Sequence, residues 1–367
     1  MTLIDKKLKV MHFVSGFKNG GVEQVVLNYT SLLNKNYNIE ESVIYQHMAD
    51  PEKLRLSRQI GNRMYQIPFK KTHPIKNLYA TYNLIKKQKP DIVHAHMNLV
   101  NFFPLMVSKF LGVPVRISHS HIARDNVNSK LVPFFKKLNM FFATDLMACG
   151  EAAGKYMYGN KNFTILYNAI DQSRYQFNKE YRKEIRQRYN IDKNTIILGS
   201  IGRNVKQKNQ KFLIDIFANY LKINSNSLLM LIGNGLLSDD LDEYIRQKSC
   251  TDKVIRIKQV LSTEKYYSAF DVFLLPSLYE GLPVVAIEAQ ESGVTTLLSK
   301  NIDPTVMFTN NVKLLPVNMG VKCWLQDIRK SDRKRSDIIS DKYDINIQYK
   351  HLYSYYVNTL RKKLGNV

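Results

Sequence analysis

The chain has few residues of the kinds that cross-link or anchor a protein. Its 367 residues include only three cysteines, Cys149, Cys250 and Cys323, which are far apart and odd in number. This count argues against a disulfide framework and a cysteine-based metal knuckle. No apolar run approaches the ~18–20 residues that span a bilayer, and the first residues are too mixed in charge for a signal peptide. We therefore expect a reducing, cytoplasmic environment.

Acidic residues are also scarce relative to basic ones. The chain has 31 Asp and Glu against 54 Lys and Arg, which gives a formal net charge of +23. Such a charge indicates a polyanionic partner: nucleic acid, anionic lipid headgroups or phosphorylated small molecules. No zinc knuckle, RNA-binding sheet motif or helix-turn-helix signature is visible, which weighs against nucleic acid.

What is present is a repeated alternation of short β-rich runs and helical stretches. Hydrophobic residues make up 44% of the chain, enough for sizeable cores. The alternation predicts an α/β fold with two doubly wound parallel sheets. The expected strands are Leu8–Phe13, Ile39–Tyr45, Ile92–His96, Val115–His119, Leu146–Ala148 and Phe163–Leu166, then Ile196–Ile201, Leu228–Ile232, Val254–Ile257, Val272–Leu275 and Thr296–Leu298.

A polar stretch over Tyr167–Asp192 interrupts this alternation and marks an interdomain connection. We expect an N-terminal domain over residues 1–168 and a second domain over residues 169–344. The tail, residues 345–367, has the periodicity of an amphipathic helix rich in tyrosine. In open α/β sheets ligands lie beyond the carboxyl ends of strands, so the loops after the strands are where chemistry is expected.

The most specific pattern begins in the loop after Val272–Leu275 and reads PSLYEGLPVVAIEA. Glu280 lies in the loop and Glu288 on the following helix, with Pro283 in the first turn. A fully helical path would separate the carboxylates by ~12 Å, which suits one to a hexose and the other to a ribose. The amides of Gly281 and Leu282 would meet a negative group at the helix N-terminus. The plain alternative is a capped helix with two surface glutamates.

A basic loop follows the strand Ile196–Ile201 and precedes a helix. It contains Arg203 and Lys208. The guanidinium of an arginine can donate two parallel hydrogen bonds and the ammonium of a lysine is a compact charge, so the two residues are well suited to hold a diphosphate. A solvated basic turn is the alternative.

Two further loops carry candidate residues. Gly20 and Gly21 follow the first strand and permit close approach of backbone to a ligand, although the full dinucleotide fingerprint is missing. His119 and His121 lie at a strand end, where they can hydrogen-bond a sugar hydroxyl or a developing charge. Their shared parity on an extended chain allows both to point the same way. His94 and His96 end the neighbouring strand, but no acidic residue accompanies the four histidines at ligand spacing, so we expect no metal site.

The acidic pair Asp240 and Asp242 has the spacing that metal-dependent sugar transferases use. Here it lies in the first turn of an amphipathic helix, where acidic residues suit the helix dipole, and we expect no metal role.

Together these motifs resemble family 4 of the retaining glycosyltransferases, which act in bacterial polysaccharide and lipid glycosylation. The resemblance covers about residues 8–360. Glu280 and Glu288 match the E-x7-E motif of that family, Arg203 and Lys208 match its paired cations, and Gly20 and Gly21 match its first glycine loop.

The resemblance implies a GT-B fold, in which two Rossmann-like domains face a central cleft and a C-terminal helix crosses back to the first domain. It implies that Glu288 binds the ribose, and that Glu280 binds the donor hexose with the amides of Gly281 and Leu282. The segment of His119 and His121 matches the strand end that supplies an active-site histidine, with the choice between them open. The donor would be a nucleotide sugar, UDP-linked by default, used without a metal or other cofactor. The acceptor would be lipid-linked or a saccharide.

The charge of the first domain favours a peripheral place on the inner face of the cell membrane. Basic residues there adjoin Leu131–Phe142, a stretch of bulky apolar residues that would suit an anionic surface; core packing explains those aromatics equally well. Two other functions stay open: a nucleotide-sugar epimerase on the same scaffold, and a basic nucleic-acid-binding protein.

Overall fold

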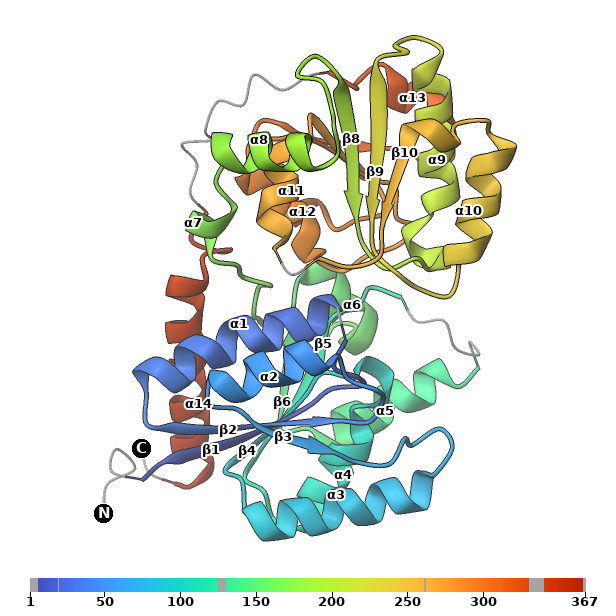
Figure 1. Ribbon diagram of the computed structural model, residues 1–367. Coiled ribbons are helices and arrows are strands. Elements are labelled where there is room, and N and C mark those ends of the chain that lie inside the picture. Colours follow the sequence, from blue (N-terminus) through green and yellow to red (C-terminus); the bar gives the residue numbers. More distant parts are fainter. Residues whose placement is uncertain (1–5, 19, 125–129, 261, 330–339, 366–367) are drawn as a thin grey trace. The chain divides into compact units, whose positions relative to one another are not determined.

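The computed structural model describes residues 6–18, 20–124, 130–260, 262–329 and 340–365. The chain divides into two compact units, one of Met1–Ala169 with Asp341–Val367 and one of Ile170–Ser340 (Figure 1). Among the helices described, none combines the length and apolarity needed to cross a membrane.

The first unit is built on a seven-stranded sheet in the order β3-β2-β1-β4-β5-β6-β7, in which every pairing is parallel. Its strands are β1 (Leu8–Phe13), β2 (Ile39–Tyr45), β3 (Arg63–Gln66), β4 (Ile92–Ala95), β5 (Val115–Ser120), β6 (Asp145–Ala148) and β7 (Thr164–Ile165).

Helices connect these strands, as parallel pairing requires. They are α1 (Gly21–Asn36), α2 (Pro51–Gln59), α3 (Pro74–Gln88), η1 (Asn98–Val100), α4 (Phe102–Phe110), α5 (Val132–Phe142), α6 (Glu151–Tyr158) and, from the end of the chain, α14 (Ile345–Lys363). Although more than 300 residues separate them in sequence, α14 lies beside α1 (Figure 1). The ring of Tyr353 on α14 stacks on Tyr37 just after α1, with centroids 3.6 Å apart.

The second unit repeats the plan with a six-stranded parallel sheet in the order β10-β9-β8-β11-β12-β13. Its strands are β8 (Ile196–Ile201), β9 (Ser227–Ile232), β10 (Val254–Ile257), β11 (Val272–Leu275), β12 (Thr295–Ser299) and β13 (Val312–Leu315). Its helices are α7 (Gln172–Tyr175), α8 (Lys179–Arg188), η2 (Lys206–Lys208), α9 (Gln210–Leu221), α10 (Ser238–Gln247), η3 (Thr251–Lys253), α11 (Thr263–Ala269), α12 (Val284–Glu291), η4 (Pro304–Val306) and α13 (Val321–Leu325).

The predicted α/β class and the two doubly wound sheets are confirmed, and each predicted strand is present to within one or two residues. Two edge strands, β3 and β13, were not predicted. Each is four residues long, and β3 has no buried side chain. Pro283 was predicted in the first turn of the helix but lies one residue before it, since α12 begins at Val284.

Each sheet reverses its strand order once, between β1 and β4 in the first unit and between β8 and β11 in the second. Such a reversal leaves the carboxyl ends of two adjacent strands uncovered by crossing helices, which makes it the preferred ligand position in this architecture. The two places where chemistry is expected are therefore fixed by topology alone.

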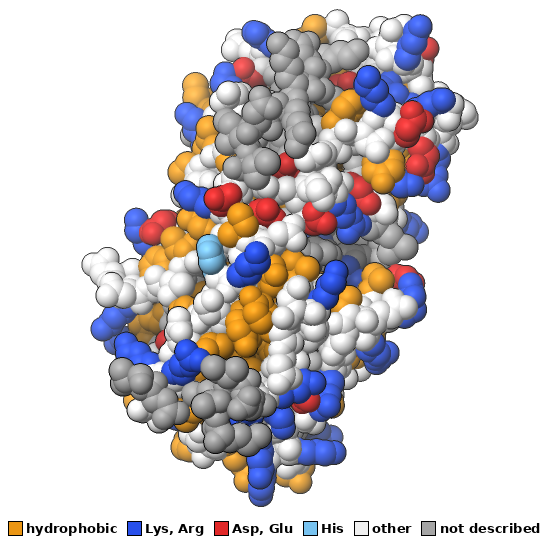
Figure 2. Space-filling view, turned by 90° about the vertical axis from the view of Figure 1, so that its left-hand side faces the viewer, with side chains coloured by type: hydrophobic (Ala, Val, Ile, Leu, Met, Phe, Trp, Pro, Cys, Tyr) orange, Lys and Arg blue, Asp and Glu red, His pale blue; other side chains and the backbone are white. Residues whose placement is uncertain are grey.

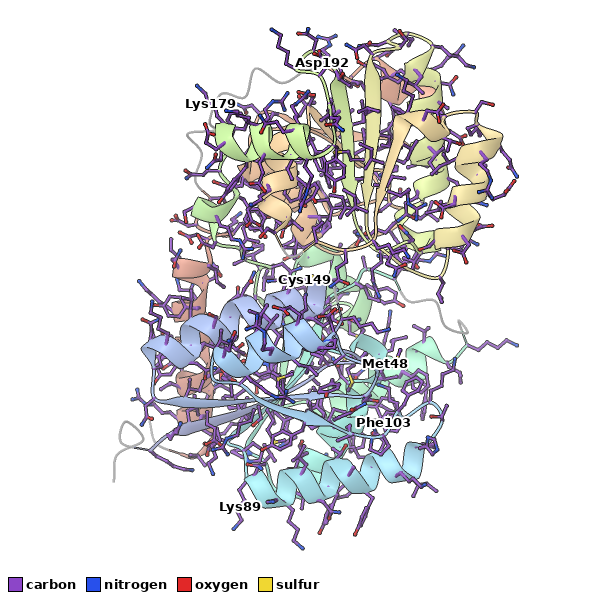
Figure 3. All side chains as sticks on the ribbon, in the orientation of Figure 1. Met48, Lys89, Phe103, Cys149, Lys179 and Asp192 are labelled. Carbon is purple, nitrogen blue, oxygen red and sulfur yellow. The ribbon has the colours of Figure 1, made fainter. Side chains whose placement is uncertain are left out.

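A buried carboxylate attaches the charged helix α8, which begins at Lys179 (Figure 3), to the second sheet. Asp271, at the start of β11, accepts from Arg182 at 2.7 Å and from Arg186 at 2.9 Å. It also accepts from the backbone N–H of Ile197 in β8. The polar composition of α8 thus serves a structural ion-pair network rather than a solvated linker.

The interior of the first sheet contains five histidines. His12 lies in β1, His94 in β4 and His119 in β5, while His96 and His121 follow β4 and β5 directly, and all are at most 5% exposed. Burial, helped by the neighbouring rings, lowers the pKa of His94, His96 and His119 well below the usual value, and burial lowers that of His121 to about 3. These rings are neutral in the folded unit near neutral pH.

This burial predicts that the first unit loses stability on mild acidification. An unfolded histidine takes up a proton near pH 6.5, whereas these four resist it when folded, so their contribution is present above about pH 6.5 and is lost as pH falls below it. Each ring contributes up to ~1.4 kcal/mol per pH unit in that range. We expect the free energy of unfolding to fall by on the order of 5 kcal/mol between pH 7.5 and 5.5.

The measurement is urea unfolding of the whole chain, followed by circular dichroism and by tryptophan fluorescence. The chain has a single tryptophan, Trp324, which is fully buried in the second unit and reports on that unit alone. The first unit unfolds in the transition that circular dichroism detects but Trp324 fluorescence does not. The urea midpoint of that transition should be lower at pH 5.5 than at pH 7.5. Equal movement of both transitions, or none, would contradict the assignment.

Candidate functional site

At the β8/β11 reversal of the second unit, the two predicted loops meet through an ion pair. Lys208 Nζ lies 2.6 Å from a carboxylate oxygen of Glu280, and both side chains are largely buried. Gln207 also contacts Glu280. Its side-chain amide donates to the second carboxylate oxygen of Glu280 at 3.1 Å and to the backbone carbonyl of Tyr279 at 3.0 Å. The structure therefore brings the basic loop and the acidic loop into one group.

Backbone contacts fix the shape of both loops. The N–H of Leu278 donates to the carbonyl of Gln207 at 2.8 Å, and the Asn209 side chain donates to the carbonyl of Pro276. Asn209 has a left-handed backbone (φ 54°), a conformation that asparagine tolerates better than most residues, and it ends the short η2 turn that presents Lys208.

The loop after β9 packs against the loop that carries Arg203 and Lys208. A Cβ on Gly233 would lie 1.9 Å from the carbonyl oxygen of Gly202, and one on Gly235 would lie 2.4 Å from that of Asn204. Asn204 in turn donates to the Gly233 carbonyl. The glycines of this segment are therefore required for close packing against the Lys208 loop. A small hollow lined in part by Gly202, Lys208 and Leu275 opens at this edge.

Glu288 occupies a separate position on α12, buried among tyrosines. Tyr267 O–H donates to Glu288 Oε2 at 2.7 Å. Burial raises the pKa of the Glu288 carboxyl, while hydrogen bonds from Tyr267 and Tyr175 and the nearby Arg174 partly oppose that rise. No described contact joins Glu288 to the Lys208–Glu280 group, so the two halves of the E-x7-E motif have distinct partners.

The other predicted residues of this unit lie around the same edge. Arg203 is exposed, and its guanidinium makes no ion pair with any residue the structure describes. Gly281 and Leu282 are buried in the turn that leads from Glu280 into α12. The backbone N–H groups of this turn precede the first turn of the helix, where donors have no partner within the helix.

In the first unit, Gly20 caps α1 and Gly21 begins it. A Cβ on Gly20 would lie 2.0 Å from a carboxylate oxygen of Glu23, whereas one on Gly21 would meet nothing within 4 Å. Because the Glu23 side chain is flexible, this approach does not require glycine at position 20, and Gly21 is exposed.

His119 and His121 are brought together as their shared parity predicts, with ring centroids 4.0 Å apart. They belong to the larger histidine group at the β1/β4 edge, which includes His12, and Glu41 of β2 lies in contact with it, 2.8 Å from His12. Sequence reasoning missed His12 and Glu41 because nothing local links them to the later histidines. Only the pairing of β1 with β2 and β4 reveals the contact.

Two sets of histidines, His12–His94–His96 and His96–His119–His121, have ring nitrogens within 4.8 Å of one another, a spacing compatible with a metal ion. Both nitrogens of His12, His94 and His96 already take part in hydrogen bonds, however. Only His119 and His121 keep a nitrogen without a partner among the described residues, too few for the usual three or four ligands.

The acidic pair on α10 is occupied at the surface. Asp240 pairs with Lys211 at 2.9 Å and Asp242 with Arg256 at 2.7 Å. Asp240 lies in the first turn of the helix, as expected.

The second unit offers groups that suit a ligand with both a negative charge and neutral polar groups. Lys208 and Arg203 supply positive charge on one loop, while Glu280 and the turn after it supply an acceptor and backbone donors on the next. Gln207 and Tyr267, which sequence reasoning did not single out, position Glu280 and Glu288; the spacing of the motif gives no signal for either. The histidine edge of the first unit offers neutral polar groups.

The chain is similar to known glycosyltransferases. A family model described as glycosyl transferases group 1 matches residues 181–320, which include Lys208, Glu280 and Glu288. The putative glycosyltransferase EpsF of Bacillus subtilis (strain 168) is 30% identical over 339 residues, covering 88% of this chain and 87% of EpsF. An Escherichia coli UDP-Gal:alpha-D-GlcNAc-diphosphoundecaprenol alpha-1,3-galactosyltransferase is 27% identical over 241 residues, covering 61% of this chain and 62% of that enzyme.

Among solved structures, Anabaena Alr3699/HepE in complex with UDP and glucose superposes with a TM-score of 0.80 over 95% of this chain and 99% of that one. At 16% identity this likeness concerns the fold, which is of the GT-B type with two Rossmann-like α/β units. Because the similarity to EpsF extends over most of both chains and the family model includes the Lys208 and Glu280 loops, this chain belongs to the group 1 glycosyltransferases.

Proposed function

We propose that the chain is a retaining, family 4 enzyme that transfers a hexose from a UDP-sugar to a lipid-linked or saccharide acceptor in cell-surface polysaccharide synthesis. The Lys208–Glu280 ion pair at the β8/β11 reversal carries this proposal. A cation suits phosphate and a carboxylate suits sugar hydroxyls, and this pair lies at a reversal of strand order, which is the preferred ligand position in this architecture.

On this proposal the donor lies along the two loops of the second unit. Lys208 and Arg203 hold the diphosphate, Glu280 accepts from hydroxyls of the hexose, and the amides of Gly281 and Leu282 add donors. Glu288, kept in place by Tyr267, accepts from the ribose. The donor named for the E. coli relative and the ligand of the Anabaena structure both contain UDP, which supports the choice of nucleotide.

The proposed reaction uses no protein nucleophile and no metal. The acceptor hydroxyl attacks the anomeric carbon on the face from which the diphosphate departs, and a departing phosphate oxygen takes the hydroxyl proton. The protein contributes by holding the reactants and by stabilising the charge that develops on the leaving group. We assign that second role to Lys208 and Arg203, and His119 and His121 of the first unit stay predictions.

A membrane-bound acceptor agrees with one surface of the first unit, which we call the α4–α5 patch. It consists of four exposed apolar side chains with nearby lysines: Phe110, Leu131, Phe134, Phe141, Lys109, Lys136 and Lys137. Residues 131, 134 and 141 share one face of α5, and only Asn139 of that helix is buried. Core packing, which the sequence alone left open, therefore explains Phe142 and Phe135, which contact the core and Phe102, but not the exposed Phe134 and Phe141.

Basic residues in this patch stay close to its aromatic rings. Lys109 Nζ lies 3.8 Å from the centre of the Phe141 ring. By contrast, Arg116 donates to the carbonyls of Phe142 and Val113 and so supports the fold. On the face in Figure 2, Lys and Arg are scattered rather than clustered, so charge alone does not mark a docking surface on that face. Apolar exposure and charge together favour anionic lipid at the α4–α5 patch.

We expect Glu280→Gln and Glu288→Gln each to lower kcat/KM for sugar transfer by about 10- to 100-fold, because each removes one charge-assisted contact. The assay measures transfer from a panel of UDP-sugars to a sugar on undecaprenyl diphosphate, in excess EDTA, with the product anomer read by NMR. Glu280→Gln should also weaken donor binding, since the amide does not pair with Lys208.

The matched control is Asp240→Asn with Asp242→Asn, two acidic residues whose ion pairs lie at the surface of the same unit. This double variant should transfer sugar at the parent rate. Parent activity in both glutamate variants, or activity that appears only with added manganese and is lost in Asp240→Asn, would contradict the site. Conversion of the donor to an epimer with no transfer would identify the epimerase instead.

We expect the protein to sediment with vesicles of phosphatidylglycerol and phosphatidylcholine at low salt, and much less in high salt or with phosphatidylcholine alone. Phe134→Ser with Phe141→Ser should weaken binding at least about 10-fold, because each ring that enters the interface contributes on the order of 1.5 kcal/mol or more. Salt weakens the part that the lysines contribute.

The matched control for the vesicle experiment is Ile223→Ser with Leu236→Ser, since both residues are strongly exposed in the second unit. This pair should bind as the parent does. Equal and negligible binding of the parent to both kinds of vesicle at low salt would refute membrane docking and leave transfer itself untouched.

A further inference from the structure

A half-buried lysine, Lys70, lies beside the reversal of strand order in the first unit. It belongs to the loop after β3, and its ammonium nitrogen is 3.4 Å from Sδ of Met97, in the loop after β4. Its backbone N–H donates to the side-chain oxygen of Gln46, which directly follows β2. Three loops therefore meet around this ammonium at the carboxyl edge of the sheet, next to the β1/β4 reversal that is the preferred ligand position of such a sheet.

The ammonium of Lys70 has no counter-ion in the part of the chain that the structure describes. Its hydrogen-bond partner is the thioether sulfur of Met97, which is a weak acceptor. That sulfur also accepts from the side-chain amide of Gln46 at 2.9 Å, and both Met97 and Gln46 are buried. The fold thus provides apolar and amide surroundings for this positive charge, and no carboxylate.

Such surroundings are unfavourable for a charge that the lysine still carries. Burial lowers the pKa of Lys70 to about 8, so the side chain is mostly protonated at pH 7. A lysine that only covers apolar surface extends its ammonium into water, where the charge costs little. A half-buried ammonium without a counter-ion costs free energy, and that cost is removed when a ligand supplies the negative charge.

The neighbouring loop adds a neutral donor to this cation. The ring of His47, in the loop after β2, packs on Phe69 with centroids 4.0 Å apart. Burial lowers the pKa of His47, and the charges of Lys70 and Lys18 lower it further, so these charges lie near the ring. His47 is therefore neutral near pH 7 and has one N–H to donate. Its side chain is exposed, which leaves this edge accessible from solvent.

We propose that Lys70, with His47 beside it, binds a phosphate group of a ligand held by the first unit. An ammonium donates to charged oxygens in charge-assisted hydrogen bonds, and the imidazole N–H adds a neutral one. Two substrates of the proposed function carry phosphate, the lipid-linked acceptor and the nucleotide donor. We expect the acceptor, because the second unit already has Lys208 and Arg203 for the donor. That choice rests on the proposed function, whereas the phosphate site does not.

The site is tested by calorimetry on the whole chain at pH 7 with three probes. Methyl farnesyl diphosphate is a diphosphate diester without a sugar, farnesol is its counterpart without phosphate, and UDP represents the donor. The parent should bind the diester more tightly than farnesol. Lys70→Met keeps an apolar stem and removes the charge. It should weaken diester binding about 10- to 100-fold, the value of one charged hydrogen bond, and leave the other two affinities unchanged.

The matched control is Lys71→Met, because Lys71 is the next residue and its side chain is exposed. This variant should bind all three probes as the parent does. A loss of affinity for UDP alone in Lys70→Met would keep the site and identify the donor as the source of the phosphate. Parent affinities for both the diester and UDP in Lys70→Met, or an equal loss in Lys71→Met, would overturn the site.

The pH dependence of diester binding identifies the group that carries the charge. Lys70 loses its proton near pH 8, whereas an exposed lysine keeps it to about pH 10.4. His47 is neutral and the diester keeps its charge throughout, so the parent affinity should fall at least about 10-fold between pH 7 and 9.5. Lys70→Arg should keep its affinity over that range. Lys18 is common to both proteins, so equal profiles would refute the role of Lys70.

The assignment to the acceptor is tested separately in the transfer assay. Lys70→Met should raise KM for the lipid-linked acceptor about 10-fold or more and leave KM for the nucleotide sugar unchanged. Parent KM values for both substrates would overturn the acceptor as the source. The calorimetry involves no turnover, so a parent that transfers sugar from no nucleotide sugar would overturn the proposed function and leave the phosphate site standing.

Discussion

Parallel strand pairing is the constraint on which both candidate edges depend. When all strands of a sheet run the same way, every carboxyl end lies at one edge, and a reversal of strand order opens a gap between the connecting helices there. In the second unit the reversal is at β8 and β11, which brings together Lys208 and Glu280, more than 70 residues apart. In the first unit it is at β1 and β4, which brings His12 beside His94 and His96.

Four carboxyl groups in or near these edges are buried, and a buried carboxyl group requires a hydrogen-bond or ion-pair partner. The partner is different for each of the four. Asp271 is held by two arginines and serves the fold. Glu280 pairs with a single lysine and a glutamine at a more accessible edge, where a ligand can compete for it. Glu288 is surrounded by tyrosine hydroxyls, and burial raises its pKa. Among the described residues, Glu41 pairs with His12. These carboxylates are all buried, so their partners distinguish them better than burial does.

This difference explains which parts of the molecule the sequence could predict. β8 and β11 were predicted with their bounds because mostly apolar runs mark strands buried on both faces. The edge strands β3 and β13 were missed because few buried side chains give them a pattern. Glu280 and Lys208 were found because each lies in a recognisable loop. Glu41, His12 and Tyr356 lie far apart in sequence, and only the pairing of β1 with β2 and β4 and the position of α14 connect them.

The two units differ in how their buried polar groups are compensated. In the second unit Lys208 is largely buried and has Glu280 as its counter-ion, while Arg203 on the same loop is exposed. In the first unit burial lowers the pKa of His94, His96, His119 and His121, so these rings stay neutral near neutral pH. A buried neutral ring still has polar atoms whose loss of water is costly unless they are hydrogen-bonded. The cost of burying five imidazoles is therefore met largely by hydrogen bonds among the rings themselves.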